Sequence, residues 1–231
     1  MGERIIMEIA YIQSISLIDF PNTLSSIVFT QGCNFRCPYC QNPDLLRMSR
    51  GKLTGNEALK YFSRISDRIE GVSITGGEPT IQKDLVRFCR AIKDLGLKVK
   101  IDTNGSNPRV VRELLDREIL DYIAMDFKAP LQKYKAIARV NINPNTILET
   151  ARTIMDHSIP YEFRTTVARE LLSLDDLIEI ARTLEGARMY VVQKVRFIKT
   201  LDNIPFTPYS DGDLEGIKDV ILQYVGSFLV R

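Results

Sequence analysis

The sequence is poor in histidine, in cysteine and in long apolar runs. Its 231 residues include a single histidine, His157, and four cysteines. One histidine argues against a histidine-rich zinc site and against a catalytic triad built on histidine. No apolar run reaches the ~20 residues that a membrane-spanning helix needs. Residues 1–7 lack the apolar core of a secretion signal, so we expect a cytoplasmic protein with no membrane partner.

The charge of the chain is close to balanced. There are 31 lysine and arginine residues against 29 aspartate and glutamate residues, which gives a net charge of +2. This balance argues against a nucleic-acid partner. Hydrophobic residues make up 45% of the chain and charged residues 26%, as in ordinary globular proteins. A disordered chain and a collagen-like fibre are thereby excluded.

Short apolar runs alternate with helical patterns along the chain. No repeat or linker interrupts them, so we predict one domain over residues 1–231. It would consist of an N-terminal extension over about 1–24, a core over about 25–200 and a C-terminal segment over about 201–231. Period and composition predict strands at 26–30, 72–75, 97–101, 122–125, 161–167 and 188–192. Helices are predicted at 58–65, 81–95, 109–116, 145–157, 174–184 and 213–225.

Strands that alternate with helices indicate parallel strands joined by helical crossovers. Six such units occupy residues 25–226, whereas a complete eight-unit barrel usually takes about 250 residues. We therefore predict an α/β fold, a partial (β/α)6 barrel with its helices outside. A flat doubly wound sheet is the alternative. In both folds, ligands bind at the C-terminal ends of the strands.

Three of the four cysteines lie close together, just after the first predicted strand. Cys33, Cys37 and Cys40 follow the spacing C-x3-C-x2-C. Three thiolates can hold a [4Fe–4S] cluster and leave one iron open to a substrate or cofactor. The fourth cysteine, Cys89, lies on the apolar face of a predicted helix and is expected in the core.

Other kinds of site also fit some of these cysteines. A zinc-stabilised interaction module needs a fourth ligand, for which only Cys89 and His157 remain. The tetrapeptide Cys37-Pro-Tyr-Cys40 is also the active site of glutaredoxins, so a thiol–disulfide oxidoreductase is the stronger rival. That rival leaves Cys33 unexplained. A disulfide is disfavoured in a cytosolic chain.

Glycines and polar residues follow the other predicted strands. Because parallel strands end at the same edge of a sheet, we expect these residues to gather there. Together they offer a carboxylate for an amine, a cation for a carboxylate and accessible backbone groups, as a zwitterionic amino-acid ligand requires. Each one alone could be an ordinary turn or a surface charge. They are Gly76, Gly77, Glu78, Asp102, Asn104, Asp126, Lys128 and Gln193, together with the apolar Phe127 between two of them and with Arg164, which lies on the fifth predicted strand itself.

These motifs resemble those of the radical S-adenosylmethionine (SAM) enzymes, specifically the activating enzymes of glycyl-radical proteins. The cysteine loop, with Tyr39 before its third cysteine, and the Gly-Gly-Glu-Pro sequence at 76–79 are the two signatures of that superfamily. Longer stretches resemble the activating proteins of anaerobic ribonucleoside-triphosphate reductase, in the same order over about residues 11–200. Those stretches are 16–21, 29–37, 102–105 and 125–128.

The resemblance implies a [4Fe–4S] cluster on Cys33, Cys37 and Cys40, with SAM on the open iron. Reductive cleavage of SAM would give a 5′-deoxyadenosyl radical that takes a hydrogen atom from a partner's glycine, with no catalytic residue beyond the two cofactors. The implied partners are anaerobic ribonucleoside-triphosphate reductase and a one-electron donor of the flavodoxin or ferredoxin type. The implied SAM-binding residues are Tyr39, Gln41, Gly76, Gly77, Glu78, Asp102, Asn104, Asp126, Phe127, Lys128, Arg164 and Gln193.

The chain departs from the family pattern at one position. Activating enzymes of pyruvate formate-lyase place a histidine after the last barrel strand, where this chain has Gln193. Some activating enzymes also carry cysteines for a second cluster, which Cys89 alone cannot provide. Activation of pyruvate formate-lyase, or action on a small molecule as in 7-carboxy-7-deazaguanine synthases, are the alternatives within the superfamily. By position, residues 9–21 and 203–213 are expected to contact the partner.

Overall fold

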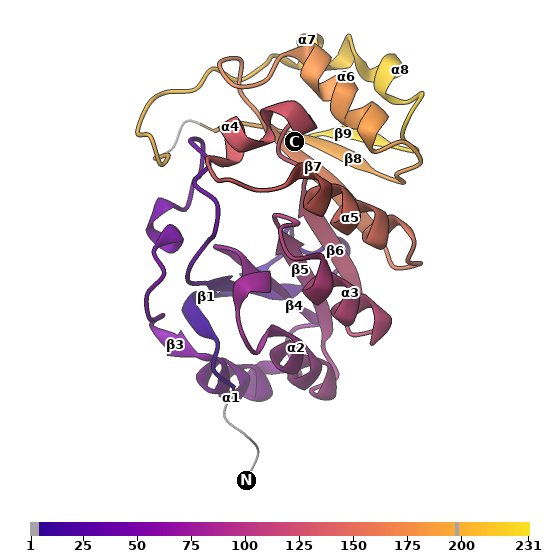
Figure 1. The fold of residues 1–231 in the computed structure, drawn as a ribbon. Helices are drawn as coiled ribbons and strands as arrows, with labels where there is room; N and C mark the ends of the chain where they lie inside the picture. The colour runs from indigo at the N-terminus through magenta and orange to yellow at the C-terminus, as the bar shows by residue number, and fades with distance from the viewer. Residues whose placement is uncertain (1–4, 197–198) are drawn as a thin grey trace. The chain divides into compact units, whose positions relative to one another are not determined.

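A computed structural model describes residues 5–196 and 199–231, and they form two compact units (Figure 1). The first unit contains the residues up to Asn34 together with Asp44–Thr103 and Asn107–Ile123. The second contains Phe35–Pro43, Asn104–Ser106 and the chain from Ala124 onward. The strand β6 begins in the first unit and ends in the second. The cysteine loop is likewise divided between the units.

The first unit is built on a sheet with the strand order β3-β1-β2-β4-β5. β1 runs antiparallel to both β2 and β3, while β2, β4 and β5 run parallel to one another. The register sets Thr30 opposite Gly76, so β2 and β4 end level with each other. The strands are β1 (Glu8–Ser16), β2 (Ser25–Thr30), β3 (Leu53–Thr54), β4 (Gly71–Gly76), β5 (Lys98–Thr103) and β6 (Tyr122–Asp126).

Helices of this unit cover one side of β4 and β5, as Figure 1 shows. Thr54 caps the first of them because its side chain accepts from Glu57 N–H, and the Glu57 carboxylate accepts from Thr54 N–H at 2.7 Å. Such a reciprocal cap satisfies two backbone donors at a helix start. The helices are α1 (Gly55–Ile65), α2 (Leu85–Asp94) and α3 (Pro108–Asp116), with the 3-10 turns η1 (Pro43–Leu46) and η2 (Pro79–Ile81).

The second unit continues from the end of β6 in the order β6-β7-β8-β9. β7, β8 and β9 are parallel, and α6 and α8 pack together. No helix among the described residues is long and apolar enough to cross a membrane. The further strands of the second unit are β7 (Tyr161–Val167), β8 (Tyr190–Lys194) and β9 (Phe228–Val230). Its helices are η3 (Leu131–Lys133), α4 (Tyr134–Ala138), α5 (Pro144–Met155), α6 (Leu174–Thr183), α7 (Asp211–Glu215) and α8 (Lys218–Ile221).

All six predicted strands are present, but the boundaries of two predicted helices are wrong. Ile81 does not begin α2, because Glu78 caps a 3-10 turn with Pro79 at its first position and the chain is extended again at Gln82. The helix predicted over 213–225 is two short helices, α7 and α8, which Gly216 separates. Glycine weakens a helix interior, which explains the break.

Three strands were not predicted from the sequence. β1 escapes the period-2 pattern because its pairing with β2 contains two register shifts and its exposed and buried residues do not alternate. β3 and β9 are too short to form a pattern. The last predicted strand lies at 190–194 instead of 188–192, so Gln193 and Lys194 belong to β8 and do not follow it.

Ser173 provides a test of helix capping in the second unit. Its Oγ accepts from Asp176 N–H at 3.2 Å, and the Asp176 carboxylate accepts from Ser173 N–H at 2.8 Å. Ser173→Ala should lower the free energy of unfolding by about 1 kcal/mol in urea denaturation. Ser63→Ala, at an exposed position inside α1, should change it by less than about 0.5 kcal/mol. Equal effects of the two changes would contradict the assignment of the cap.

Candidate active site

Backbone hydrogen bonds join the loop after β2 to the turn after β4. Gly77 N–H donates to the Thr30 carbonyl at 3.0 Å, and Glu78 N–H donates to the Gly32 carbonyl at 2.8 Å. A Cβ on Gly77 would lie 1.9 Å from the Gly32 carbonyl oxygen, and one on Gly76 would lie 2.3 Å from the Thr30 nitrogen. From the sequence, we expect these glycines to let a ligand approach the backbone. In the structure they are also required by the close approach of the chain to itself.

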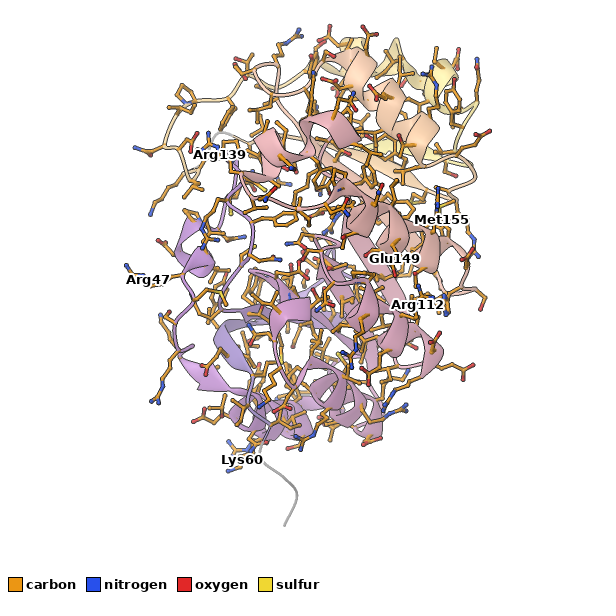
Figure 2. The ribbon with its side chains drawn as sticks, in the orientation of Figure 1. Arg47, Lys60, Arg112, Arg139, Glu149 and Met155 are labelled. Atoms are coloured by element: carbon orange, nitrogen blue, oxygen red, sulfur yellow. The ribbon has the colours of Figure 1, made fainter. Side chains whose placement is uncertain are left out.

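Cys33 lies where this loop contacts the 3-10 turn η1, the part of the chain that follows the cysteines. Gly32 takes a φ of +96°, and its N–H donates to the Leu45 carbonyl at 2.8 Å. Cys33 N–H donates to the Leu46 carbonyl at 3.4 Å. Arg47 follows η1 directly, and Figure 2 shows its side chain extending outward from the ribbon. The Cys33 backbone is therefore fixed by its neighbours, and its side chain is buried.

The Glu78 carboxylate holds the turn after β4 to the end of β5. It is 1% exposed. Its Oε1 accepts from the Thr80 N–H at 3.0 Å and from the hydroxyls of Thr80 and Thr103 at 2.5 and 2.7 Å. These bonds satisfy a carboxylate that would be costly to bury alone. They give Glu78 a structural role, while the SAM contact expected of it stays a prediction.

A buried lysine pairs with Asp102 at the end of β5. Lys100 is 2% exposed, its ammonium binds the Asp102 carboxylate, and its Nζ lies 3.4 Å from Ser73 Oγ on β4. Lys100 and Asp102 are two residues apart, so they share one face of the strand. The burial of Lys100 was not predicted from the sequence, in which Lys98 and Lys100 alternate with Val99 and Ile101 as on a strand with one exposed face. The structure exposes Lys98 and buries Lys100.

Three of the predicted charged residues meet in the second unit. Asp126 accepts from Lys128 Nζ on one oxygen at 3.2 Å and from Arg164 Nε on the other at 2.9 Å. Burial alone would raise the pKa of Asp126, but the Arg164 and Lys128 cations outweigh it and lower the pKa to about 2. Burial would likewise lower the pKa of Lys128, yet Asp126 raises it well above its usual value. The cluster is therefore fully charged near neutral pH.

Lys128 also faces the part of the cysteine loop that belongs to this unit. Its Nζ lies 6.0 Å from the centroid of the buried Tyr39 ring. Burial raises the pKa of the Cys37 thiol, and the nearby Lys128 charge acts in the opposite direction. Burial raises the pKa of Cys40 as well, with backbone and Lys128 effects opposing it. An ammonium here favours thiolates, the form that binds metals.

The segment 35–43 of the cysteine loop is held by backbone hydrogen bonds near its start and at its middle. Arg36 N–H donates to the Ala138 carbonyl at the end of α4, at 2.9 Å. Leu201 N–H donates to the Cys40 carbonyl at 3.0 Å. A segment of the C-terminal part of the chain thus helps to hold two of the cysteines.

The donor atoms of the loop fit an iron–sulfur cluster. Cys37 and Cys40 lie in one tight turn, in which Cys40 N–H donates to the Cys37 carbonyl at 3.0 Å. Cys33 belongs to the first unit. Within residues 5–196 and 199–231, no three Cys, His, Asp or Glu side chains are already arranged around a metal position. Thiolates are the usual ligands of such clusters, and metal binding can itself order its ligands.

Two predicted residues have structural partners in the second unit. Phe127 is fully buried and its ring packs edge-on against Tyr134, with centroids 5.8 Å apart. The Asn104 Oδ1 accepts from Ser106 N–H at 3.0 Å, which closes a short turn. These contacts explain both residue types without a ligand, and their SAM contacts stay predictions.

Gln41 and Gln193 are partly exposed. Gln193 pairs with Thr166 along β7 and β8. His157 lies after α5, where its Nδ1 is 2.7 Å from the Thr153 carbonyl oxygen. Cys89 is fully buried in α2, as predicted.

Comparison with known proteins gives concordant matches. The model of the Radical SAM superfamily matches residues 27–184. The “Putative glycyl-radical enzyme activating enzyme MJ1227” of Methanocaldococcus jannaschii is 29% identical over 229 residues, which is 95% of this chain and 94% of that protein. The pyruvate formate-lyase-activating enzyme of Listeria monocytogenes is 28% identical over 209 residues, 84% of this chain and 79% of that protein.

A solved structure shows the same fold. The radical SAM methyltransferase from Sphaerobacter thermophilus superposes with a TM-score of 0.71 at 17% identity, over 92% of this chain and 67% of that one. The predicted α/β class, a partial barrel of mostly parallel strands, is thereby confirmed. The flat doubly wound sheet is not the fold.

The glycine turn gives a test of the loop contact. Gly77→Ala places a methyl group on the Gly32 carbonyl oxygen, so it should cost about 3 kcal/mol or more of stability and lower the iron bound per chain on reconstitution. Gly96→Ala is the control, because nothing lies within 4 Å of its Cβ position and only its φ of +80° is unfavourable. It should cost about 1–2 kcal/mol. Full stability and iron content in Gly77→Ala would contradict the contact.

Asp126 gives a test of the charged cluster by pH. Its pKa is lower in the folded chain than the value of about 3.9 in an unfolded one, so its charge stabilises the fold above about pH 4. That contribution is lost as the pH falls from about 4 to about 2. The stability difference between wild type and Asp126→Asn should therefore be largest at pH 6 and shrink over this range, measured by urea unfolding. A difference independent of pH would contradict the pairing.

Proposed function

The chain belongs to the Radical SAM superfamily, and we propose that it activates a glycyl-radical enzyme, namely anaerobic ribonucleoside-triphosphate reductase. Membership implies a [4Fe–4S] cluster and SAM as cofactors. The observation that carries the proposal is the likeness to the M. jannaschii protein named as an activating enzyme, which spans 94% of that protein. The stretches 16–21, 29–37, 102–105 and 125–128 support the reductase as the partner.

Cys33, Cys37 and Cys40 would hold the cluster. When bound, the cluster and SAM supply one-electron chemistry that ends in removal of a hydrogen atom from glycine. An electron donor of the flavodoxin or ferredoxin type, in the cytoplasm, would serve this chemistry. The chain itself binds and orients, as proteins that use such cofactors generally do.

The charged residues described above suit SAM, which carries an amine and a carboxylate at one end. Lys128 and Arg164 are largely buried cations that can bind its carboxylate. Asp126 keeps both cations in place and stays ionised. The Tyr39 ring offers a flat apolar face for the adenine. No residue of this cluster needs to accept a proton, which agrees with the single histidine of the chain.

Pyruvate formate-lyase is the second candidate partner. The specific support is the L. monocytogenes relative, whose name states that activity and whose match covers 84% of this chain. Against it stands Gln193, at the position where the activating enzymes of that partner place a histidine.

Reconstitution with iron and sulfide tests the cofactor part of the proposal. Cys33→Ala should lose both the cluster and the reductive cleavage of SAM under dithionite, because two thiolates cannot hold a cuboidal cluster in place. Wild type should bind about four irons per chain. Cys89→Ala should keep both properties, since Cys89 is a core residue of α2. A working dithiol at Cys37 and Cys40 in Cys33→Ala would favour the glutaredoxin-like alternative.

Electron paramagnetic resonance then tests the partner. The reduced protein, mixed with SAM and anaerobic ribonucleoside-triphosphate reductase, should produce a glycyl-radical doublet on the reductase. The same mixture with pyruvate formate-lyase should produce none. A signal on the lyase alone would assign the second candidate, and SAM cleavage without a signal on either would contradict the activating function.

A further inference from the structure

Glu162 is a buried carboxylate that lies next to Arg164 and is not among the residues proposed to bind SAM. Glu162 is two residues earlier on β7, so it shares the strand face of Arg164, and it is 2% exposed. Its Oε1 is 3.9 Å from Arg164 Nη1. A buried carboxylate is costly unless other groups compensate its charge. Glu162 therefore attracts the same guanidinium that Asp126 uses.

Arg231 compensates Glu162 from the far end of the sequence. Its two terminal nitrogens donate to the two oxygens of Glu162 at 3.0 and 2.8 Å. Its backbone continues the pairing of β8 and β9: Arg231 N–H donates to the Val192 carbonyl, and Lys194 N–H donates to the Arg231 carbonyl, both at 2.9 Å. The sheet thus fixes the place from which this side chain reaches Glu162. Paired donation of this kind is the strongest arginine–carboxylate geometry.

Together these groups form a row of alternating charge: Lys128, Asp126, Arg164, Glu162 and Arg231. We propose that Arg231, through Glu162, is a positioning residue that keeps the Arg164 guanidinium on Asp126. When Arg231 is paired with Glu162, both carboxylate oxygens of Glu162 accept from it. Arg164 then donates its Nε–H to Asp126 at 2.9 Å. Without Arg231, two carboxylates compete for one guanidinium, and Glu162 is the more deeply buried of the two. The consequence for SAM rests on the proposed function; the consequence for Arg164 does not.

The alternative is that Arg231 only stabilises the second unit. A matched pair in the same unit separates the two possibilities. Lys133 Nζ lies 2.7 Å from Asp176, which is buried like Glu162. The Lys133 side chain is 46% exposed and that of Arg231 42%. Lys133→Met therefore removes a similar ion pair that does not touch Arg164.

Nitrogen-15 NMR of the arginine-labelled, reconstituted protein in its oxidised state tests the position of Arg164 directly. Arg164→Lys assigns its Nε–H resonance. In wild type that proton should be protected from solvent exchange by its bond to Asp126. Arg231→Met should lose the protection, because the guanidinium turns toward Glu162. The double variant Glu162→Gln with Arg231→Met should recover it, because the competing charge is gone.

SAM affinity of the same reconstituted variants gives the functional readout. Arg231→Met should weaken SAM binding about tenfold, a coupling typical of contacting charged residues. The double variant should return to within about threefold of wild type, and Lys133→Met should not change the affinity. The rate of SAM cleavage at saturating SAM should be unchanged in Arg231→Met, in the double variant and in Lys133→Met. Arg231→Lys, which keeps the charge and loses the paired donation, should show a smaller shift in the same direction and replaces Arg231→Met if that variant does not fold.

The two readouts separate the possible failures. Unchanged Nε–H protection in Arg231→Met, or a double variant as perturbed as Arg231→Met, would overturn the positioning role. If Arg231→Met changes the Arg164 Nε–H resonance but the wild-type protein does not bind SAM, the positioning role stands and the proposed function is wrong. Lys133→Met separates positioning from mere stabilisation: it also leaves a buried carboxylate uncompensated, yet it should change neither the Nε–H protection of Arg164 nor the SAM affinity.

Discussion

The carboxylate of Asp126 is the group on which the charges of the second unit depend. Lys128 and Arg164 are both largely buried, and each gives Asp126 a hydrogen bond. Two cations so close would repel each other without it. Because they lower the pKa of Asp126 to about 2, the acid stays charged near neutral pH. The same interaction sets Lys128 beside Tyr39 and Arg164 in reach of Glu162, so the cysteine loop and β7 share one electrostatic centre.

In the first unit, backbone hydrogen bonds hold the loop after β2 against the turn after β4. Its loop and turn approach so closely that two glycines are needed, and the buried Glu78 carboxylate then ties the turn to β5. A rigid frame of this kind fixes Cys33 independently of the charged groups of the second unit. Cofactor chemistry needs such preorganised supports, since the protein contributes orientation more than reactive groups.

The sequence predicted what depends on local patterns. Six strands, the capped helices and the residues at the strand ends follow from periodicity and from the shared edge of parallel strands. It could not predict β9 or the pair of Glu162 and Arg231, whose partners are 69 residues apart. It also misjudged the helix at Ile81, because a capped turn replaced the first helical turn. Glu78, Asn104 and Phe127 show a further limit: their residue types fit a ligand site, yet each has a partner within the chain.

We infer that three cysteines hold a cluster whose fourth iron is open to SAM. Mössbauer spectroscopy of protein reconstituted with iron-57, recorded with and without SAM, tests this arrangement. SAM should change the spectrum of a single iron site of the cluster and leave the other sites as they were. A spectrum that SAM does not change, or one in which all irons have thiolate ligands, would rule out an open iron site for SAM.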